Sequence, residues 1–332
     1  MMLPQIRQAP WYPGQFGVSG SDVQRGLRWA PTGIVLYVDE NHPGATTVGD
    51  GTNPEYPLTT ITQAITNLIN FATAMSVSLE GSVIVVGNEA TIAETVIIPP
   101  TAPTNCTILG AGSTAHQPTW TAAAAAGTAL TVRQEGWTIE GITFEAGAEG
   151  TSIRLEEVPG SGYISYKTTI RNCRFDGLWG GLYGIDFYGA PHRVRVEDCE
   201  FLEWRSADGA AFAIYISNTA HDRPLQCRFH NNLFWSNENH VGSFNVGSSW
   251  NSSVFTGNVF DQNAYIATTV MLDLRGSVIH NVVTGNVFSG TYSNAGGYYD
   301  STTVAGMWVG NIAEDVASPQ VGDNGYTVLP PV

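Results

Sequence analysis

The sequence is poor in charge, above all in positive charge. Asp, Glu, Lys and Arg make up only 13% of its 332 residues, well below the ~25% usual in soluble domains. Lys167 is the single lysine, and 29 acidic residues outnumber 14 basic ones, so the formal net charge is -15. A protein that binds nucleic acid through its phosphates needs a basic face that displaces counterions. We therefore expect no nucleic-acid partner.

Long hydrophobic runs are also missing. No segment reaches the ~18 consecutive apolar residues of a membrane-spanning helix. The opening MMLPQIRQAPWYPGQFGVSG has neither a basic start followed by an apolar run nor a small-residue cleavage site. We expect no membrane insertion and no signal peptide.

Cysteine and metal-binding motifs are scarce. The chain has 4 cysteines, too few to fix a redox compartment, and a chain of this size needs no disulfide framework. Neither Cys-x-x-Cys nor His-Glu-x-x-His occurs. The sequence thus predicts no metal site and no cofactor.

What the sequence does contain favours an all-β fold. Hydrophobic residues reach 43%, enough for a core, and 37 glycines accompany many Asn, Ser and Thr residues, a composition typical of frequent tight turns. From about residue 100 a six-residue phrase recurs: apolar, any, then Gly, Asn or Asp, then Asn, Cys or Ile, any, Phe. The intervals between its copies, 25 to 36 residues, suit a solenoid with variable loops. The copies end at Phe144, Phe175, Phe201, Phe234, Phe260, Phe288 and Ala313, after a weaker one at Ile108.

The columns of the aligned phrases identify the kind of solenoid. The third position is always Gly, Asn or Asp, residues that enter the left-handed backbone region at little cost, so each repeat should bend there. The fourth position is asparagine in the last four phrases, and these amides should bond between coils as a ladder. Phenylalanine at the sixth position should stack inward, with coils ~4.8 Å apart as in a parallel β-helix. The ladder residues are Asn232, Asn258, Asn286 and Asn311.

Other periodic folds fit less well. Leucine-rich repeats require regularly spaced leucines, and propeller blades require four strands in ~40 residues. Neither pattern is present. A β-sandwich with coincidental Asn-x-Phe turns is the remaining alternative.

The segment before the repeats adds a family resemblance. Residues 37–65, YVDENHPGATTVGDGTNPEYPLTTITQAI, resemble the opening of the pectin-lyase-like right-handed β-helix superfamily, where a Tyr-Val-Asp strand, a Gly-Thr loop and Pro-x-x-Thr-Ile-x-x-Ala-Ile precede the first coil. The resemblance covers about residues 34–313. It implies an all-β, single-stranded right-handed parallel β-helix of about eight or more coils with an N-terminal capping helix. We expect Thr59 or Thr60 as the N-cap. The apolar residues at helical spacing are Ile61, Ala64, Ile65, Leu68, Ile69 and Ala72.

The chain divides into four parts on this interpretation. Residues 1–33 form an extended arm, 34–80 a cap with a short helix, 81–313 the parallel β-helix and 314–332 a C-terminal tail. The arm is rich in Pro and Gly and cannot bury a core alone, so we expect it to dock on another protein. Its apolar anchors are Trp11, Tyr12, Phe16 and Trp29.

Charged residues gather in the middle coils. In the second and fifth positions opposite charges alternate on adjacent coils, which is typical of ion-pair ladders on a solvated sheet. Residues that we place on loops outside the phrase are better catalytic candidates, although ordinary loop polarity also explains them. These candidates are Asp186, Glu203, Asp208, Asp222, His192 and Arg205. Cys173 and Cys199 share one column, which predicts a buried stack of thiols.

Aromatic residues of the same region offer a second kind of site. Aromatic rings can stack on sugar rings, and packing at the rim of the solenoid explains them equally well. The glycan-binding candidates are Trp179, Tyr183, Tyr188 and Trp204. The catalytic strings of pectinolytic enzymes, a Gly-His-Gly with paired Asp or an Arg-x-Lys, are absent. No catalytic residue can therefore be carried over from the family.

The outward columns of the last coils predict self-association. The fifth position changes there from charged residues to Leu233, Val259, Val287 and Ile312. Such an apolar stripe is rarely left bare on a soluble monomer. Either a C-terminal segment such as residues 326–332 covers it, or identical stripes meet around a three-fold axis. We expect a homotrimer, because closed symmetry buries the same patch on every subunit.

Two functions from different classes follow. The favoured one is a structural virion component of a tailed bacteriophage, a head decoration or tailspike/fibre-type protein that binds other virion proteins through its arm and a glycan at the host surface. Its location would be the phage particle. The alternative is a polysaccharide lyase or glycoside hydrolase acting on an acidic or bacterial surface polysaccharide. Such an enzyme would normally carry an export signal, and we find none.

Overall fold

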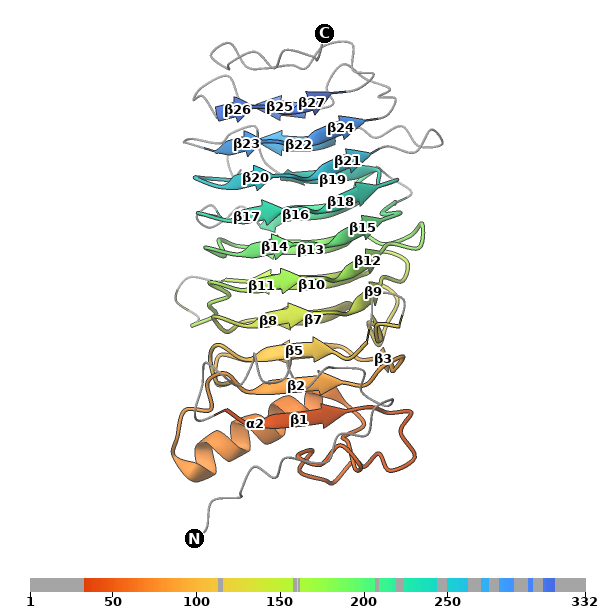
Figure 1. Cartoon of the computed structure of the whole chain (residues 1–332), viewed down its shortest axis with the longest axis vertical. Helices are drawn as coiled ribbons and strands as arrows, with labels where there is room; N and C mark the ends of the chain where they lie inside the picture. Colours follow the sequence, from red (N-terminus) through yellow and green to blue (C-terminus); the bar gives the residue numbers. More distant parts are fainter. Residues whose placement is uncertain are drawn as a thin grey trace.

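The computed structural model places short parallel strands in three sheets that run the length of the molecule (Figure 1). We call the three sheets A, B and C. From β2 (Val83–Val86) to β25 (Tyr298–Asp300) the chain adds a strand to sheet A, then to sheet B, then to sheet C, and repeats this circuit. In the described part of the chain every pairing between strands is parallel, for example that of β11 (Thr169–Arg171) with β14 (Arg195–Glu197). The predicted all-β parallel solenoid is confirmed. The structure describes residues 33–112, 116–157, 160, 162–206, 209–218, 224–243, 250–261, 270–274, 281–289, 298–300 and 307–313.

Within the described ranges the three sheets contain ten, nine and eight strands. Sheet A comprises β1 (Val35–Val38), β2 (Val83–Val86), β5 (Thr107–Gly110), β8 (Thr138–Glu140), β11 (Thr169–Arg171), β14 (Arg195–Glu197), β17 (Arg228–His230), β20 (Val254–Thr256), β23 (Val282–Thr284) and β26 (Met307–Val309). Sheet B comprises β3 (Thr91–Ala93), β6 (Thr119–Thr121), β9 (Thr143–Glu145), β12 (Arg174–Asp176), β15 (Glu200–Leu202), β18 (Leu233–Trp235), β21 (Val259–Asp261), β24 (Val287–Ser289) and β27 (Ile312–Ala313). Sheet C comprises β4 (Val96–Ile98), β7 (Thr128–Val132), β10 (Thr151–Glu156), β13 (Tyr183–Tyr188), β16 (Phe212–Asn218), β19 (Asn239–Ser243), β22 (Val270–Leu274) and β25 (Tyr298–Asp300).

Helix α2 (Ile61–Met75) lies at the N-terminal end of the stack, as expected for a cap (Figure 1). Thr60 is its N-cap, and the Thr60 hydroxyl accepts a hydrogen bond from the Gln63 N–H at 3.2 Å. The carboxylate of Glu94, between β3 and β4, also accepts the N–H groups of Ile61 and Thr62, at 2.8 and 3.1 Å. Such acceptors satisfy backbone donors that the first helical turn leaves without a partner. The Glu94 contact joins the cap to the first coils.

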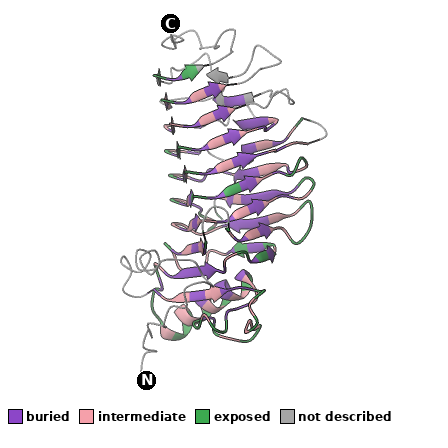
Figure 2. Ribbon diagram, turned by 45° about the vertical axis from the view of Figure 1, so that its right-hand side comes forward, coloured by how far each residue is buried: buried purple, intermediate pink, exposed green. Residues whose placement is uncertain are grey.

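Inside the stack, the phenylalanines at the sixth position of the phrase form one continuous column, as predicted. Neighbouring rings from Phe144 to Phe288 lie almost parallel, with centroids 4.7 to 5.3 Å apart. Trp120 extends the column toward the N-terminus at 5.4 Å. All these side chains are buried. Figure 2 shows buried residues recurring on the strands along the stack. An aromatic pair adds roughly 0.5–1.5 kcal/mol beyond the burial of its area, so the column stabilises the junctions between coils from β6 to β24.

The predicted bend lies between sheets A and B. Its third-position residues, from Gly141 to Gly310, all have a left-handed backbone with φ between 51° and 69°. The fourth-position asparagines are buried and bonded in series. The Nδ2 group of Asn232 donates to Oδ1 of Asn258 at 2.9 Å, and the Asn232 backbone N–H donates to the same oxygen at 3.0 Å. The same pair of bonds joins Asn258 to Asn286 and Asn286 to Asn311.

Each ladder amide also bonds to the coil before it. The second Nδ2 hydrogen of Asn258 donates to the carbonyl of Phe229 at 3.0 Å, and that of Asn286 to Phe255 at 3.0 Å. One asparagine therefore connects three successive coils. At the start of the ladder the N–H of Cys199 donates to Oδ1 of Asn232 at 3.0 Å. All four cysteines are buried and free, including Cys173 and Cys199, whose shared column predicted burial.

The other two bends have bonds that the repeat did not predict. Between sheets C and A the N–H of Cys227 donates to the Ser253 hydroxyl at 3.2 Å, and the N–H of Ser253 donates to Oδ1 of Asn281 at 2.8 Å. Between sheets B and C, Oδ1 of Asn237 accepts a hydrogen bond from the Trp204 N–H of the preceding coil at 3.1 Å. Nδ2 of Asn237 lies 3.1 Å from Nδ1 of His240. Burial lowers the pKa of His240 to about 3, so its ring is neutral at pH 7.

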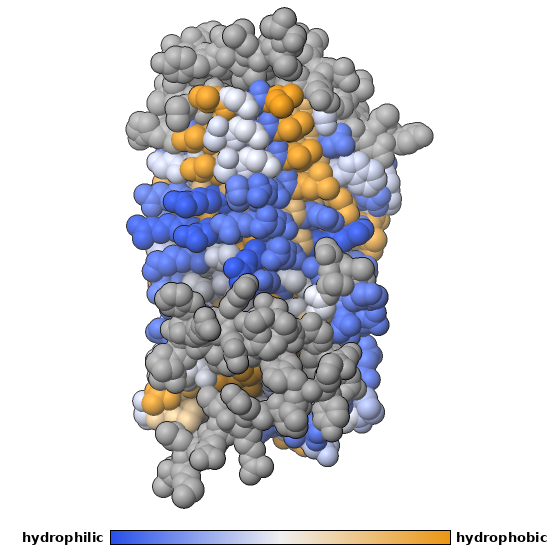
Figure 3. All heavy atoms as spheres, in the orientation of Figure 1, coloured by the Kyte–Doolittle hydropathy of each residue, from blue (hydrophilic) through white to orange (hydrophobic). Residues whose placement is uncertain are grey.

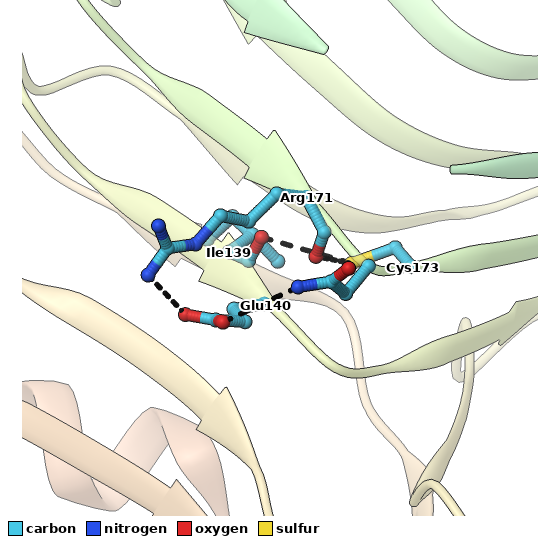
Figure 4. Close-up of polar contacts among 5 residues, drawn as sticks. Ile139, Glu140, Arg171 and Cys173 are labelled. Atoms are coloured by element: carbon cyan, nitrogen blue, oxygen red, sulfur yellow. Dashed lines mark hydrogen bonds and ion pairs between the residues drawn. The ribbon is translucent and has the colours of Figure 1, made fainter. Parts of the chain in front are cut away.

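The outer charges of the middle coils only partly follow the predicted ion-pair ladders. Arg171 on β11 contacts Glu140 on β8 at 2.7 Å, as expected for adjacent coils (Figure 4). In the fifth position, however, Arg174 bonds at 3.0 Å to Asp176 of its own strand. Asp176 lies two residues after Arg174, so both side chains are on the same side of β12 and can pair within the strand. The pair of Arg174 and Glu200 that the ladder predicts between adjacent coils is thus replaced by the pair of Arg174 and Asp176.

Replacing Asn258 by leucine tests the ladder. We expect a loss of about 1–3 kcal/mol in the free energy of unfolding, because the N–H and Nδ2 groups of Asn232 lose their acceptor in a buried bend. Denaturant unfolding of wild type and variant measures the difference. The matched control is Asn70→Leu, at an exposed position of α2. Equal losses in the two variants would contradict the ladder.

Candidate functional site

The outer face of sheet C brings together three of the residues singled out from the sequence. Tyr183, Asp186 and Tyr188 all lie on β13, so our placement of Asp186 on a loop was wrong. The six-residue phrase covers only sheets A and B, and the third strand of each coil lies in the variable sequence between phrases. Ile185 and Phe187 point into the core, which turns Asp186 to the outer side.

Asp186 is fully buried although it lies on the outer side of the strand. Its Oδ2 accepts a hydrogen bond from Nε of Arg154, the residue paired with it on β10, at 2.8 Å. Burial raises the pKa of Asp186, and the Arg154 guanidinium partly opposes this effect. The Arg154 side chain keeps 34% of its surface exposed. The carboxylate therefore holds a guanidinium that solvent and ligands can reach.

The preceding coil repeats this arrangement. Arg133, which directly follows β7, donates from Nε to Glu156 at 2.7 Å. Each guanidinium also lies over a tyrosine ring: Arg133 is 4.5 Å from the ring centre of Tyr163, and Arg154 is 5.0 Å from that of Tyr188. The carboxylate bound at Nε and the tyrosine ring that faces the guanidinium together fix the orientation of each arginine side chain. These Arg133 and Arg154 groups form what we call the arginine pair.

An aromatic cluster lies at the start of the next strands. Tyr183 on β13 stacks on Tyr215 of β16 with ring centres 4.8 Å apart, and Tyr215 stacks on Phe212 at 4.4 Å. Gly242 of β19 makes room for this cluster, because a Cβ atom there would lie 2.4 Å from the Phe212 ring. Tyr183 and Phe212 remain partly exposed. Tyr215 pairs with Asp186, the residue that holds Arg154, so the cluster lies on the same face of sheet C as the arginine pair.

Several other candidates have structural roles. Trp204 is buried and donates its indole N–H to the carbonyl of Phe175 at 3.3 Å, so its assignment as a glycan-binding residue was wrong. Glu203 occupies a left-handed bend with φ 59°. Burial, reinforced by the charge of Asp176, raises the pKa of Glu203.

The remaining described candidates lie on connections beside sheet C. The Arg205 guanidinium lies 4.7 Å from the ring centre of Trp179, which is 46% exposed. His192 stacks on Tyr166 at 4.7 Å. Asp208 and Asp222, together with the arm anchors Trp11, Tyr12, Phe16 and Trp29, lie outside the described residues.

Arg133 and Arg154 were not singled out from the sequence. The segment TSIRLE of β10 alternates around Ile153 and Leu155, a pattern that would have turned Arg154 outward. The partner of Arg154 lies 32 residues further along the chain. This separation in sequence depends on the lengths of the loops in the coil, so the pairing of Arg154 with Asp186 becomes visible only in the folded structure.

The arrangement suits polar, ring-shaped ligands. A partly exposed guanidinium offers paired N–H donors to a carboxylate, and partly exposed tyrosine rings can pack on the apolar face of a sugar. No group of three or more His, Cys, Asp or Glu side chains that could hold a metal ion occurs in the part of the chain that the structure describes. In the same part, no helix has both the length and the apolar character needed to span a membrane.

Comparison with known proteins identifies the family. A family model described as right-handed β-helix region matches residues 128–306, and the chain belongs to this family. No curated protein matches the sequence. Among solved structures, pectate lyase Pel9A is similar, with a TM-score of 0.49 and 12% identity over 90% of this chain and 79% of that one.

Two further solved structures are similar at lower scores. An alginate lyase from Paenibacillus sp. str. FPU-7 has a TM-score of 0.47 and 14% identity, over 80% of this chain and 96% of that one. Tailspike protein gp49 from Acinetobacter baumannii bacteriophage Fri1, a capsular polysaccharide depolymerase, has a TM-score of 0.37 and 11% identity, over 91% of this chain and 64% of that one. The right-handed parallel β-helix is established by the family match and the sheet topology.

The raised pKa of Asp186 predicts how stability depends on pH. A carboxyl that takes up a proton more readily in the folded state stabilises the fold at low pH, and this contribution is lost as pH rises through the folded pKa. The stability of wild type relative to Asp186→Asn should therefore fall as pH rises from below 3.8. In an Arg154→Gln background the fall should extend to higher pH, because the opposing charge is gone. Denaturant unfolding across pH measures both. If the stability of wild type relative to Asp186→Asn rose with pH, this result would contradict a raised pKa of Asp186.

Proposed function

We propose that the chain is a structural component of a tailed bacteriophage particle that binds a bacterial surface polysaccharide through the outer face of sheet C. The observation that carries the binding role is the arginine pair beside the aromatic cluster. Arg154 and Arg133 are each held by a carboxylate and a tyrosine ring, on adjacent coils. This arrangement favours sugars that carry carboxylates, bound through the arginines and stacked on the rings.

The electrostatic setting sharpens this choice of ligand. The chain has a formal net charge of -15, so an acidic glycan is repelled by most of the molecule. A face that binds such a glycan must place its few cations where the ligand lies. Arginines held in position lose less freedom on binding than free ones, which favours affinity.

The virion role rests on the sequence. The repeat and its opening segment resemble the pectin-lyase-like β-helices of phage particle proteins, and the arm carries aromatic anchors between prolines and glycines. A particle protein needs a docking segment and a rigid body that projects a binding surface. The β-helix supplies the rigid body, because bonded asparagines and stacked rings join its successive coils.

The alternative is a polysaccharide lyase or hydrolase at the same face. A general acid or base must lie within reach of the proton it transfers. Among the described acidic candidates, Asp186 is fully buried against Arg154, and Glu203 forms a bend. Binding without cleavage is therefore the function we favour.

Substitution of Arg154 tests the binding role. In affinity electrophoresis the purified protein should be retarded by alginate, a polyuronate, and much less by dextran, which is neutral. Arg154→Gln should weaken alginate binding about 10- to 100-fold, the effect of losing a hydrogen bond between charged groups. The matched control is Arg171→Gln, which removes an exposed, paired arginine from sheet A and should leave binding unchanged.

Three results would contradict this role. They are absence of retardation by alginate, equal retardation by both glycans, and equal effects of the two substitutions. Release of new chain ends from alginate during incubation would instead support the lyase or hydrolase alternative.

Deletion of residues 1–30 tests the docking role. The truncated protein should retain the wild-type circular dichroism spectrum, because the described strands and the cap helix lie from Val35 onward and keep their full sequence. It should no longer be incorporated into phage particles, because the aromatic anchors are lost. Quantitative immunoblotting of purified particles measures incorporation. Normal incorporation of a folded truncated protein would contradict the docking role.

A further inference from the structure

The asparagine ladder ends at Asn311 with two hydrogen-bond donors to spare. Oδ1 of Asn311 accepts the N–H and Nδ2 groups of Asn286 at 3.0 and 2.9 Å, and Nδ2 of Asn311 donates to the Val283 carbonyl at 2.9 Å. In the coils below, each ladder residue also donates its N–H and its second Nδ2 hydrogen to Oδ1 of the next asparagine. Among the described residues, nothing accepts these two hydrogens of Asn311, which is only 5% exposed.

Buried donors without an acceptor are costly, because they lose their bonds to water and gain none in return. In the lower coils both hydrogens go to one side-chain amide oxygen of the next coil. The end of the ladder therefore has a place of defined chemistry: one further amide oxygen, one coil beyond Asn311.

The outer surface around this bend is also less covered than that of the coils below. Val309 and Ile312, on either side of the bend, are 51% and 43% exposed, whereas Val287, one coil below Ile312, is only partly exposed. Figure 3 shows hydrophobic residues on the uppermost described coils, above a hydrophilic middle. β26 and β27 are the last described strands of sheets A and B, so each offers an open edge. Open edges and apolar side chains together favour the addition of another strand.

The sequence beyond the last described strand contains a partner of this chemistry. Residues 321–326, VGDNGY, fit the six-residue phrase once more. Asp323 takes the bend position, Asn324 the ladder position, and Tyr326 the position of the stacked rings. These residues lie outside the described part of the chain. Asn324 thus carries the amide oxygen that Asn311 lacks.

The length of the connecting segment fits a closing strand better than another full coil. Ala313 and Tyr326 end successive copies of the phrase only 13 residues apart, whereas the earlier copies are 25 to 36 residues apart. The seven residues 314–320 can span at most ~25 Å. The five residues of β22 cover ~17 Å of the third side of a coil. The connection is therefore long enough to cross that side once, and too short for the loops that the lower coils carry.

We propose that residues 321–326 close the C-terminal end of the β-helix by adding a last bend to the asparagine ladder. Oδ1 of Asn324 accepts the N–H and Nδ2 groups of Asn311. Tyr326 extends the aromatic column, where tyrosine suits an end position because its ring is apolar and its hydroxyl can face water. The closing strand also occupies the edges on which strands of another molecule could pair.

Hydrogen exchange of the Asn311 amide in the full chain tests the proposal. The amide should be protected in the wild type and should exchange about 10- to 100-fold faster in Asn324→Leu, because leucine has no acceptor for it. The amide of Asn232, three coils below, should keep its wild-type rate in the variant. The matched control is Ser318→Leu, which makes a polar-to-leucine change in the same segment but outside the phrase, and should leave Asn311 protected.

Three results of the exchange experiment would overturn the proposal. They are exchange of the wild-type Asn311 amide at the rate of an exposed loop, an unchanged rate in Asn324→Leu, and equal acceleration in Asn324→Leu and Ser318→Leu. Circular dichroism of each variant separates loss of the fold from loss of the last bend.

Paired cysteines test the register separately. Val309→Cys with Gly322→Cys, and Ile312→Cys with Gly325→Cys, place two thiols at the same position of successive copies, with Cα atoms ~4.8 Å apart, a distance that permits a disulfide. Oxidised glutathione should link both pairs, as two protein thiols become one disulfide and each glutathione disulfide is reduced to two thiols. The control is the crossed pair, Val309→Cys with Gly325→Cys, whose members lie on opposite sides of the bend and should link far less. Peptide mass spectrometry measures linking. Equal linking of crossed and matched pairs, or no linking of the matched pairs, would overturn the register.

Discussion

Each asparagine of the A–B bend ties its own coil to the one before and the one after, because one side-chain amide has both an acceptor and two donors. Oδ1 of Asn258 accepts the N–H and Nδ2 groups of Asn232, while its Nδ2 donates to Asn286 and to the Phe229 carbonyl. These bonds form only when the coils are in register. A slip of one residue in a strand would turn every outward side chain inward. The ladder therefore fixes the alignment of the coils from Asn232 to Asn311.

The parallel register between coils determines which side chains meet on the outer faces of the sheets. On sheet C it sets Arg154 beside Asp186, which are 32 residues apart in sequence, and it places Tyr183 against Tyr215. On sheet B it lines up Leu233, Val259 and Val287 of successive coils. Neither surface is a property of one strand. Both arise because identical spacing between coils brings one residue from each coil to the same line.

The sequence predicted the repeated part of this fold well, since short-range rules govern it. Glycine or asparagine at the bend has the left-handed backbone, and the sixth-position rings stack. The repeat did not predict the strands of sheet C, because these strands lie in the segments of variable length between phrases. Asp186 was placed on a loop for that reason, and Trp204 was misjudged because an aromatic residue beside a bend can turn into the core as easily as out. Pairs such as Arg154 and Asp186 depend on loop lengths and on the register of the whole stack.

Native-state hydrogen exchange at single-residue resolution tests the ladder most directly. The backbone amides of Asn232, Asn258 and Asn286 donate to side-chain oxygens of the following coil, although they lie at bends. The account predicts that these three amides exchange only through global unfolding, with the same free energy of opening as the amides of the adjoining strands. Exchange of the three amides at rates typical of exposed loops would contradict it.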